Sequence, residues 1–368
     1  MLWDIFCKVI DNHGDIGVCW RLSTQLADRG ESVRLWVDDA SALSWMAPRA
    51  HNGVQVFDWD ASAGAQPGQA VIEAFGCELP GQFQEAIAAC TRARGIQPAW
   101  INLEYLTAQS FAERSHGLPS PVFAGPAAGL TKHFFFPGFT PRTGGLLREP
   151  DLVQRQEMFD RAAWLQEHGI EIGDGARLVS LFCYEPATLD GVLDQWAAGP
   201  GKTRVLVTAG RAAAAVRATV DRKTTADPSW NGAALLLLSW LPLLSQREFD
   251  HLLWACDLNF VRGEDSLVRA IWAGKPLVWH IYAQDDNAHH DKLSAFLDRL
   301  RAPGQWRDFH RAWNGIAGPL PAADPRAWGR YLLEARRELL AQDDLLTQLM
   351  RFAHAADQPP AGGAKKNR

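Results

Sequence analysis

The stretch DLNFVRGEDSLVRAIWAGKPLVWHI, at residues 257–281, contains one complete unit of an α/β fold. An apolar run at 257–261 is followed by a polar loop at 262–266 and then by a helical pattern. Gly274-Lys275-Pro276 is a helix stop signal, and a second apolar run occupies 277–281. Near-continuous apolar strands joined by a helix are typical of a parallel sheet that is covered on both faces.

The same alternation of apolar runs and helical patterns continues through the rest of the 368-residue chain. Amphipathic helical patterns occur, for example, at 16–29 and 246–255. At roughly 150 residues per domain, this length corresponds to two domains and a little more. The sequence therefore predicts an α/β protein with two Rossmann-like domains. The predicted strands are 2–9, 32–37, 54–57, 71–75 and 99–103 in the first half and 177–184, 203–208, 234–239, 257–261 and 277–281 in the second.

A Gly- and Pro-rich segment at 137–151, PGFTPRTGGLLREPD, is the best candidate for the boundary between the domains. It predicts an N-terminal domain at 1–150 and a C-terminal domain at 151–330. The residues at 331–356 have helical patterns, and we expect them to pack back on the body of the protein. The tail at 357–368 is rich in Pro, Gly and Ala and is expected to be disordered.

The composition disfavours several classes of protein. Hydrophobic residues make up 47% of the chain and charged residues 21%, as in globular domains with full cores. The net charge of −5 provides no basic field for nucleic acid, and the short basic run at 365–368 is expected to be a solvated terminus. No apolar run approaches the ~18 residues of a membrane span. The first residues do not resemble a signal peptide.

Cysteine usage indicates the compartment. The six cysteines lie at positions 7, 19, 77, 90, 183 and 256, and none forms a CxxC pair. Several lie in apolar runs, which is typical of buried free thiols in a reducing environment. We therefore expect a cytoplasmic protein without a membrane partner.

The first candidate loop is Asp11-Asn12-His13-Gly14-Asp15-Ile16-Gly17, directly after the first predicted strand. In open parallel sheets, ligands bind in the loops at the carboxyl ends of the strands. This loop lacks the GxGxxG pattern of dinucleotide-binding proteins, which disfavours an NAD-dependent dehydrogenase. Two carboxylates flank a glycine turn instead, and a position facing a second domain favours a functional role. The structural alternative is that Asp15 caps the following helix and Asp11 forms an Asx-turn.

The second candidate loop, Arg262-Gly263-Glu264-Asp265-Ser266, follows a predicted strand and begins a helix. The N–H groups and the partial positive charge of a helix start favour an anion such as a diphosphate. Arg262 could add a bidentate contact to it. Glu264 repels phosphate and fits better as an acceptor for a ribose diol or another sugar hydroxyl. The alternative is a capping box without a ligand.

Aromatic residues follow the first predicted strand of the second half, in the segment Phe182-Cys183-Tyr184-Glu185. An aromatic ring at this strand end could stack on a nucleotide base. The alternative is packing in the core, which is the commoner fate of an aromatic residue in a strand.

A second group of residues contains side chains of the kind that bind metals, in Asp285-Asp286 and His289-His290-Asp291. Adjacent histidines at a helix start do not converge on one ion, and no third ligand is evident. We therefore expect no metal, and we interpret Asp285 or Asp286 as a helix cap.

Four motifs together resemble a known family. They are DNHGDIGVCWRL at 11–22, WINLEYL at 100–106, FFFPGF at 134–139 and FVRGEDSLVRAIWAGKPLVWHIY at 260–282. They are similar to the bacterial protein-arginine rhamnosyltransferases that modify elongation factor P, the EarP family. The resemblance implies a GT-B fold, in which two Rossmann-like domains face each other across a cleft that holds the active site. It also implies inverting transfer of rhamnose from dTDP-β-L-rhamnose to one arginine of elongation factor P, which activates that factor for translation of polyproline stretches.

The resemblance also assigns roles to residues. Asp15 becomes the general base, Asp11 a second carboxylate needed for activity, and Glu264 an essential residue. The sequence departs from the family pattern in two places. His13 replaces an aromatic such as Tyr or Phe, and the stretch Leu243-Leu244-Ser245 replaces a more aromatic one. Neither a metal nor another cofactor is implied. The residues expected to bind the donor are Asn12, His13, Gly14, Phe182, Tyr184, Gln246, Arg262, Gly263, Glu264, Asp265 and Ser266.

Other functions are compatible with the same fold. A sugar-nucleotide epimerase would bind a diphosphate similarly but would act on the nucleotide sugar alone. A sugar-nucleotide-binding protein without catalytic activity would tolerate loss of Asp11 and Asp15. A glycosyltransferase that uses another acceptor is the third alternative.

Overall fold

The structure is a computed structural model, and it describes residues 1–9, 13–171, 173, 175–284 and 286–356. Of the residues singled out in the sequence, Asp11, Asn12, Asp285 and the tail at 357–368 lie outside this part. The chain divides into two compact units, one formed by residues 1–149 with 341–368 and the other by residues 150–340.

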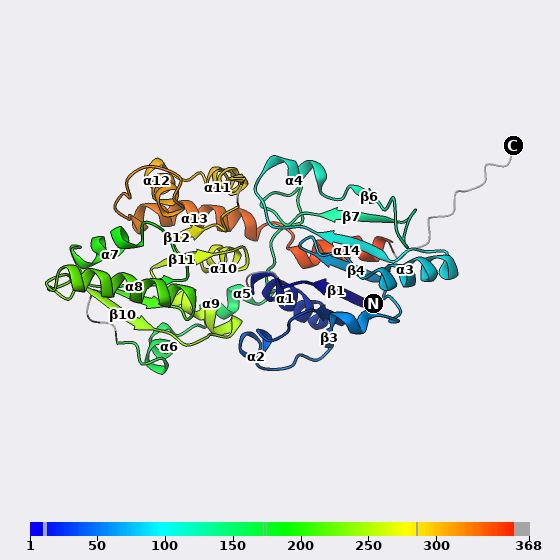
Figure 1. Cartoon of the computed structure of the whole chain (residues 1–368), viewed down its shortest axis with the longest axis horizontal. Helices are drawn as coiled ribbons and strands as arrows, with labels where there is room; N and C mark the ends of the chain where they lie inside the picture. The colour runs from blue at the N-terminus through cyan, green and yellow to red at the C-terminus, as the bar shows by residue number, and fades with distance from the viewer. Residues whose placement is uncertain (10–12, 172, 174, 285, 357–368) are drawn as a thin grey trace. The chain divides into compact units, whose positions relative to one another are not determined.

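The first unit is built on a seven-stranded sheet with the order β3-β2-β1-β4-β5-β7-β6 (Figure 1). All neighbouring strands are parallel except β6 and β7. Its strands are β1 (Leu2–Cys7), β2 (Ser32–Val37), β3 (Val54–Asp58), β4 (Ala70–Ala74), β5 (Ala99–Leu103), β6 (Pro119–Pro121) and β7 (Thr131–Phe135). Its helices are α1 (Gly14–Asp28), α2 (Leu43–Met46), the 3-10 turn η1 (Trp59–Ser62), α3 (Gly81–Arg94), α4 (Ser110–Ser115) and α14 (Leu345–Ala356).

Helices cover both faces of this sheet, because successive side chains of a strand point to opposite faces. Ile5 of β1 belongs to one core together with Leu22 of α1 and Leu349 of α14. Its neighbour Phe6 belongs to the opposite core, together with Phe83 of α3. Burial of one such side chain stabilises the fold by roughly 1.5–3 kcal/mol. The last described helix, α14, is thus part of the core of the first unit.

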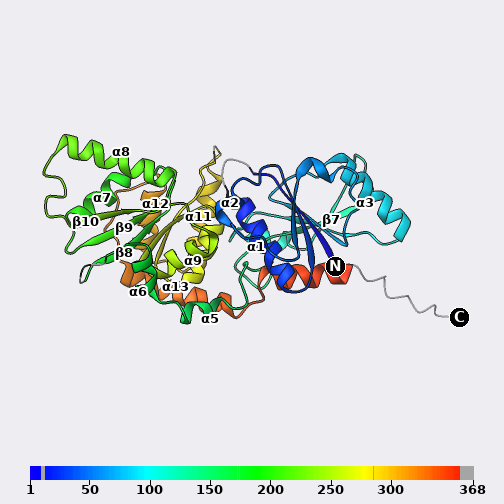
Figure 2. The same ribbon diagram turned by 90° about the horizontal axis from the view of Figure 1, so that it is seen from below.

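The second unit is built on a five-stranded parallel sheet with the order β10-β9-β8-β11-β12. Figure 2 shows α7 and α8 on one side of its strands and α6 and α13 on the other. Its strands are β8 (Arg177–Leu181), β9 (Thr203–Val207), β10 (Leu236–Trp240), β11 (Leu258–Arg262) and β12 (Leu277–His280). Its helices are α5 (Leu152–Glu157), α6 (Arg161–Glu167), α7 (Leu189–Ala197), α8 (Arg211–Ala226), α9 (Gln246–Ala255), α10 (Asp265–Ala273), α11 (Ala288–Arg299), α12 (Gly304–Trp313) and α13 (Pro325–Leu340).

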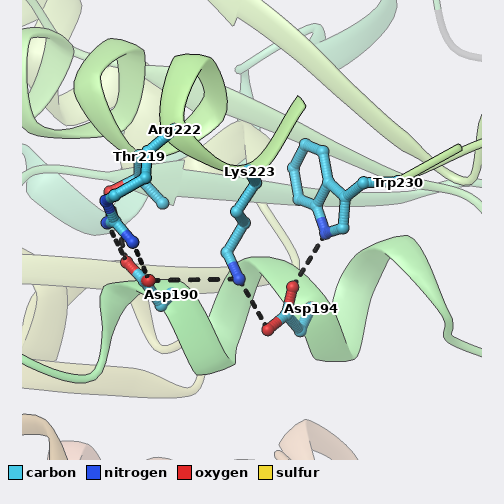
Figure 3. A network of polar contacts seen from close by, with 6 residues as sticks. All are labelled: Asp190, Asp194, Thr219, Arg222, Lys223 and Trp230. Carbon is cyan, nitrogen blue, oxygen red and sulfur yellow. Dashed lines mark hydrogen bonds and ion pairs between the residues drawn. The ribbon is translucent and has the colours of Figure 1, made fainter. Parts of the chain in front are cut away.

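The Ala-rich helix α8 is attached to α7 by polar side chains (Figure 3). Arg222 donates two hydrogen bonds to the carboxylate of Asp190, at 2.5 and 2.7 Å. Lys223 and Trp230 both donate to Asp194, at 2.7 and 2.8 Å. The hydrogen bonds from Arg222 lower the pKa of Asp190. Since the side chains of Arg222 and Asp190 are 60% and 38% exposed, their pair contributes to the orientation of α8 more than to stability.

The predicted α/β class is confirmed, and so are the two parallel sheets, apart from the antiparallel edge strand β6 of the first. Every predicted strand has a counterpart, and the helix predicted at 246–255 coincides with α9. The chain divides between Glu149 and Pro150, next to the predicted boundary, and α13 belongs to the second unit. The strands at 119–121 and 131–135 were not predicted. The first is a short Pro-Ser-Pro edge strand, which lacks the apolar pattern of a central strand.

His310 of α12 links this helix to the sheet and is fully buried. Its Nε2 accepts a hydrogen bond of 3.0 Å from the backbone N–H of Trp279. Its Nδ1 lies 3.0 Å from the carbonyl oxygen of Trp306, so the ring is neutral with its proton on Nδ1. Burial lowers the pKa of His310 to about 4.

We predict that this histidine makes the protein less stable as the pH falls. Between its unfolded pKa of about 6.5 and the folded value, the unfolded chain binds a proton that the folded chain does not. The free energy of unfolding should therefore decrease on acidification by up to ~1.4 kcal/mol per pH unit from this residue. Urea unfolding between pH 7 and pH 5 measures it. His310→Gln should be less stable at pH 7 and should lose stability less steeply, and equal slopes for the two proteins would contradict the prediction.

Candidate active site

In each unit, the strand order places candidate loops beside the point where the order of the sheet reverses. The chain runs from β1 to β2 and β3 on one side, and then to β4 and β5 on the other. In the same way it runs from β8 to β9 and β10, and then to β11 and β12. Ligands of open α/β sheets bind at the carboxyl ends of the strands where the order reverses. The ends of β1, β8 and β11 and the segments that follow them contain all the predicted site residues except Gln246, which follows β10.

In the first unit, α1 begins directly after the loop that follows β1. The N-cap residue is His13, whose side chain makes no capping hydrogen bond. Gly14 is the first residue of the helix, and Asp15 lies in the first turn, half-buried. Asp15 therefore does not occupy the N-cap position that the structural alternative required, although its charge is favourable near the positive end of the helix.

Asp15 contacts a side chain from another strand end. The hydroxyl of Tyr105, after β5, donates a hydrogen bond of 3.3 Å to Oδ2 of Asp15. The ring of Tyr105 stacks on Phe75, which follows β4, at a centroid distance of 5.0 Å. Both aromatic residues escaped the sequence analysis as site candidates, although WINLEYL includes Tyr105. Their position after parallel strands was the signal that could have identified them.

In the second unit, Arg262 at the end of β11 packs against the aromatic residues that follow β8. Its guanidinium carbon lies 4.5 Å from the ring centroid of Phe182 and 4.7 Å from that of Tyr184. One of its N–H groups donates to the carbonyl oxygen of Cys183 at 3.5 Å. Burial lowers the pKa of Arg262 below its ordinary value. The structure thus joins the predicted cation and the two predicted aromatic rings in one cluster.

The loop from Gly263 to Ser266 has a fixed conformation. Gly263 has a φ of +61°, which favours glycine, and its carbonyl oxygen accepts a hydrogen bond of 2.7 Å from Nε1 of Trp279. The hydroxyl of Ser266 accepts from the backbone N–H of Arg262 at 3.0 Å. Glu264 is the N-cap residue of α10 but makes no side-chain capping bond, so the capping box is not formed. Asp265 is the first residue of the helix.

Glu264 forms an ion pair with Lys292 of α11. Sequence reasoning missed Lys292, because the two residues lie far apart in the chain and no local pattern joins them. The lysine holds the carboxylate of Glu264 in place beside the start of α10. A fixed carboxylate of this kind can accept hydrogen bonds from two neighbouring hydroxyl groups.

Two further residues contact Tyr184 and were not predicted. His280, at the end of β12, accepts a hydrogen bond of 3.2 Å from the backbone N–H of Tyr184, and burial lowers its pKa to about 4. Arg211, at the start of α8, lies 5.0 Å from the ring centroid of Tyr184 and donates to Glu185 at 2.7 Å. Arg211 follows β9, so it too lies in a loop at the carboxyl end of a strand.

Gln246 is the first residue of α9 and is half-buried. The N-cap hydroxyl of Ser245 accepts from the backbone N–H of Glu248 at 3.2 Å. Phe249 of the same helix packs edge-to-face on Phe182, with centroids 5.3 Å apart. The start of α9 is thereby attached to the aromatic cluster.

Within the described part of the chain, no group of three or more His, Cys, Asp or Glu side chains converges in a way that could hold a metal ion. Oδ1 of Asp286 accepts a hydrogen bond of 3.0 Å from the backbone N–H of Ala288, the first residue of α11. The N-cap residue is Asn287, and α11 has no side-chain capping bond there, so Asp286 is not the helix cap that we expected. None of the described helices is both long and apolar enough to cross a membrane. The six cysteines are free thiols, and all except Cys90 are buried.

Comparison with known proteins agrees with the motifs. The family model of the elongation factor P (EF-P) rhamnosyltransferase EarP matches residues 3–354. The chain belongs to this family. It is 44% identical to the protein-arginine rhamnosyltransferase of Pseudomonas putida, over 95% of this chain and 98% of the relative. It is 40% identical to the protein-arginine rhamnosyltransferase of Pseudomonas aeruginosa, with the same coverage.

Solved structures of other proteins show the same fold. The structure named "Structural basis for EarP-mediated arginine glycosylation of translation elongation factor EF-P" has a TM-score of 0.64 and 32% identity, over 96% of this chain and 99% of its own. Arabidopsis thaliana UGT89C1 complexed with UDP has a TM-score of 0.53 at 12% identity, over 96% of this chain and 99% of its own, and thus indicates the fold alone. The protein is a glycosyltransferase of the EarP rhamnosyltransferase family with a GT-B fold. The resemblance, fold and enzyme class that the sequence predicts are therefore confirmed, and the epimerase and the binding protein without activity are disfavoured.

Proposed function

We propose that the protein transfers rhamnose from dTDP-β-L-rhamnose to the side chain of an arginine in elongation factor P, with inversion at the anomeric carbon. The observation that carries this proposal is the cluster of Arg211, Arg262 and Lys292 around Tyr184 and Glu264 at the strand ends of the second unit. It occurs in a chain that is 44% identical to a protein-arginine rhamnosyltransferase.

The second unit is suited to bind the nucleotide sugar. A diphosphate carries two negative charges, and Arg262 and the N-terminus of α10 are adjacent positive groups. Glu264, held by Lys292, can accept hydrogen bonds from a ribose diol or a sugar hydroxyl. Phe182 is only half-buried, so part of its ring is available to a base, whereas Tyr184 is buried and supports Arg262.

The leaving group in this reaction is dTDP, whose negative charge grows as the bond from the anomeric carbon to oxygen breaks. We propose that no metal takes part. The Arg262 guanidinium and the dipole of α10 would stabilise that charge, because both are fixed before the reaction begins. Burial strengthens their effect, since charges interact more strongly away from water.

The nucleophile sets the main chemical difficulty. A guanidinium has a pKa of about 12.5–13.8, so full deprotonation at pH 7 costs roughly 8–9 kcal/mol. Proton removal must therefore accompany formation of the bond from nitrogen to the anomeric carbon. In our proposal Asp15 accepts the proton, and Asp11 grips the guanidinium by paired hydrogen bonds. Attack opposite the leaving group inverts the anomeric carbon.

The acceptor is proposed to be folded elongation factor P. A guanidinium is common on protein surfaces, so specificity must come from the surface around the modified loop. We place that acceptor surface mostly on the first unit, which presents Asp15, and we propose a cytoplasmic location, which the buried free thiols support.

The first prediction of this proposal concerns the base. Asp15→Asn retains the shape of the side chain but cannot accept the proton. Transfer of rhamnose should therefore fall by at least about a hundredfold, the usual scale for a general base, while the melting temperature stays close to that of the parent protein. Turnover is measured by the intact mass of elongation factor P. A folded variant with normal turnover would contradict the role of Asp15.

The second prediction concerns the diphosphate. Arg262→Ala removes a charge-assisted contact worth roughly 1.5–3 kcal/mol, so the affinity for dTDP should fall by about 10- to 150-fold. Calorimetry with dTDP measures this. Arg330→Ala is the matched control, because that guanidinium also lies over a tyrosine ring, 4.8 Å from the centroid of Tyr331 on α13. Equal dTDP affinities for the two variants would exclude the proposed placement.

The third prediction concerns the acceptor and the metal. Incubation of the protein with dTDP-β-L-rhamnose and elongation factor P should add one deoxyhexose to the factor, and EDTA should not change the rate. The folded N-terminal domain of elongation factor P should react much faster than a peptide that spans its modified loop, because a folded surface positions the arginine.

Three outcomes would count against this proposal. Conversion of the donor without an acceptor would indicate an epimerase. Loss of activity in EDTA that magnesium restores would indicate metal catalysis. Equal rates for the peptide and the domain would place recognition in the loop alone.

A further inference from the structure

Tyr105 contacts Asp15, but the reaction proposed above assigns Tyr105 no role. Its hydroxyl donates a hydrogen bond of 3.3 Å to Oδ2 of Asp15. The side chain is far from buried, with 40% of its surface exposed. A tyrosine at such a position would sample several rotamers unless other contacts held its ring, because burial does not restrict it.

Phe75 makes a contact that restrains this ring. The two rings are stacked, with centroids 5.0 Å apart and planes inclined by 28°. The residues follow β4 and β5, and the strand order is β1-β4-β5. Since neighbouring strands lie about 4.8 Å apart, β5 is roughly 10 Å from β1, whose following loop leads into α1 and Asp15. Tyr105 thus reaches across the end of β4, and Phe75 lies beneath it at that point.

The backbone at Phe75 is adapted to this position. Its φ is +57°, in the left-handed region that is rare for a bulky residue other than glycine. Its N–H donates a hydrogen bond of 2.7 Å to the carbonyl oxygen of Leu103 on β5. Such conformations persist only where the surroundings impose them, and they cluster at functional sites. Here the strained turn directs the Phe75 ring beneath Tyr105.

We propose that Tyr105, supported by Phe75, is a positioning residue that fixes the orientation of the Asp15 carboxylate for proton transfer. The proposal rests on the assignment of Asp15 as the base. A hydrogen bond to Oδ2 restricts rotation of the carboxylate about its terminal bond, so Oδ1 keeps one direction. Tyr105 exchanges no proton with the substrate and acts only through Asp15.

The test is a double-mutant cycle measured by the intact mass of elongation factor P. Tyr105→Phe retains the stacked ring and removes only the hydroxyl. It should lower kcat by roughly 10- to 100-fold, the scale of a small misplacement of a catalytic group, and leave KM for the donor and the affinity for dTDP unchanged. In the Asp15→Asn background the same change should have almost no further effect, because the group that it positions is already lost.

Tyr331→Phe is the matched control. That hydroxyl accepts a hydrogen bond of 3.0 Å from Arg330 on α13, so its removal should leave turnover unchanged in both backgrounds. Phe75→Leu provides a second variant that keeps the Tyr105 hydroxyl but removes the stacking, and it should lower kcat in the same manner. Melting temperatures show whether each variant is folded.

The outcomes distinguish failure of the role proposed for Tyr105 from failure of the assignment of Asp15 as the base. Normal turnover of Tyr105→Phe, or an equal loss in both backgrounds, would overturn the role of Tyr105 while Asp15 could still be the base. Normal turnover of Asp15→Asn would overturn the proposed base itself. A parallel rise of KM for the donor would indicate that Tyr105 contributes to donor binding, and would also overturn the positioning role.

Discussion

Parallel strands can be joined only by crossovers, and in both units the chain makes its first crossovers to one side of the first strand and its later ones to the other. This constraint decides where chemistry can occur. At the reversal, the loops that follow two adjacent strands diverge, and the carboxyl ends between them stay open to a ligand. Asp15, Tyr184 and Arg262 all lie after or at the end of such strands. The covered faces provide rigidity, because α1 and α3 bury opposite faces of β1.

The position of Arg262 must both fix the orientation of the guanidinium and keep it charged, and burial favours the first but opposes the second. A guanidinium that binds a diphosphate must be pre-oriented, yet its removal from water has a free-energy cost that lowers its pKa. The faces of Phe182 and Tyr184 lie against it and compensate part of that cost, since the electron-rich face of an aromatic ring attracts a cation. His280 holds the backbone of Tyr184 without adding charge, because a buried imidazole with a pKa of about 4 is neutral near pH 7. The cluster is therefore positive and also fixed.

The sequence was sufficient for the parts of this structure that depend on local pattern. Apolar runs identified the central strands, and the stop signal at Gly274 coincides with a left-handed C-cap. Residues whose role depends on distant partners were not identified. Tyr105 contacts Asp15 because β5 lies next to β4, which in turn lies next to β1. Lys292 contacts Glu264 because α11 brings it there. The same reason explains β6, a Pro-Ser-Pro segment that becomes a strand by pairing with β7.

The two units carry complementary chemistry, and this division follows from the charges of the proposed substrates. The nucleotide sugar is an anion, and the second unit presents Arg262 and the start of α10. The acceptor arginine is a cation, and the first unit presents Asp15. A carboxylate among the cations of the second unit would be neutralised, as Glu264 is by Lys292, and would be a poor base. In our proposal the base lies on the first unit, apart from the cations of the second, and one of the groups that contact it is the uncharged hydroxyl of Tyr105. With this division, each of the two proposed substrates would meet groups of opposite charge on a different unit.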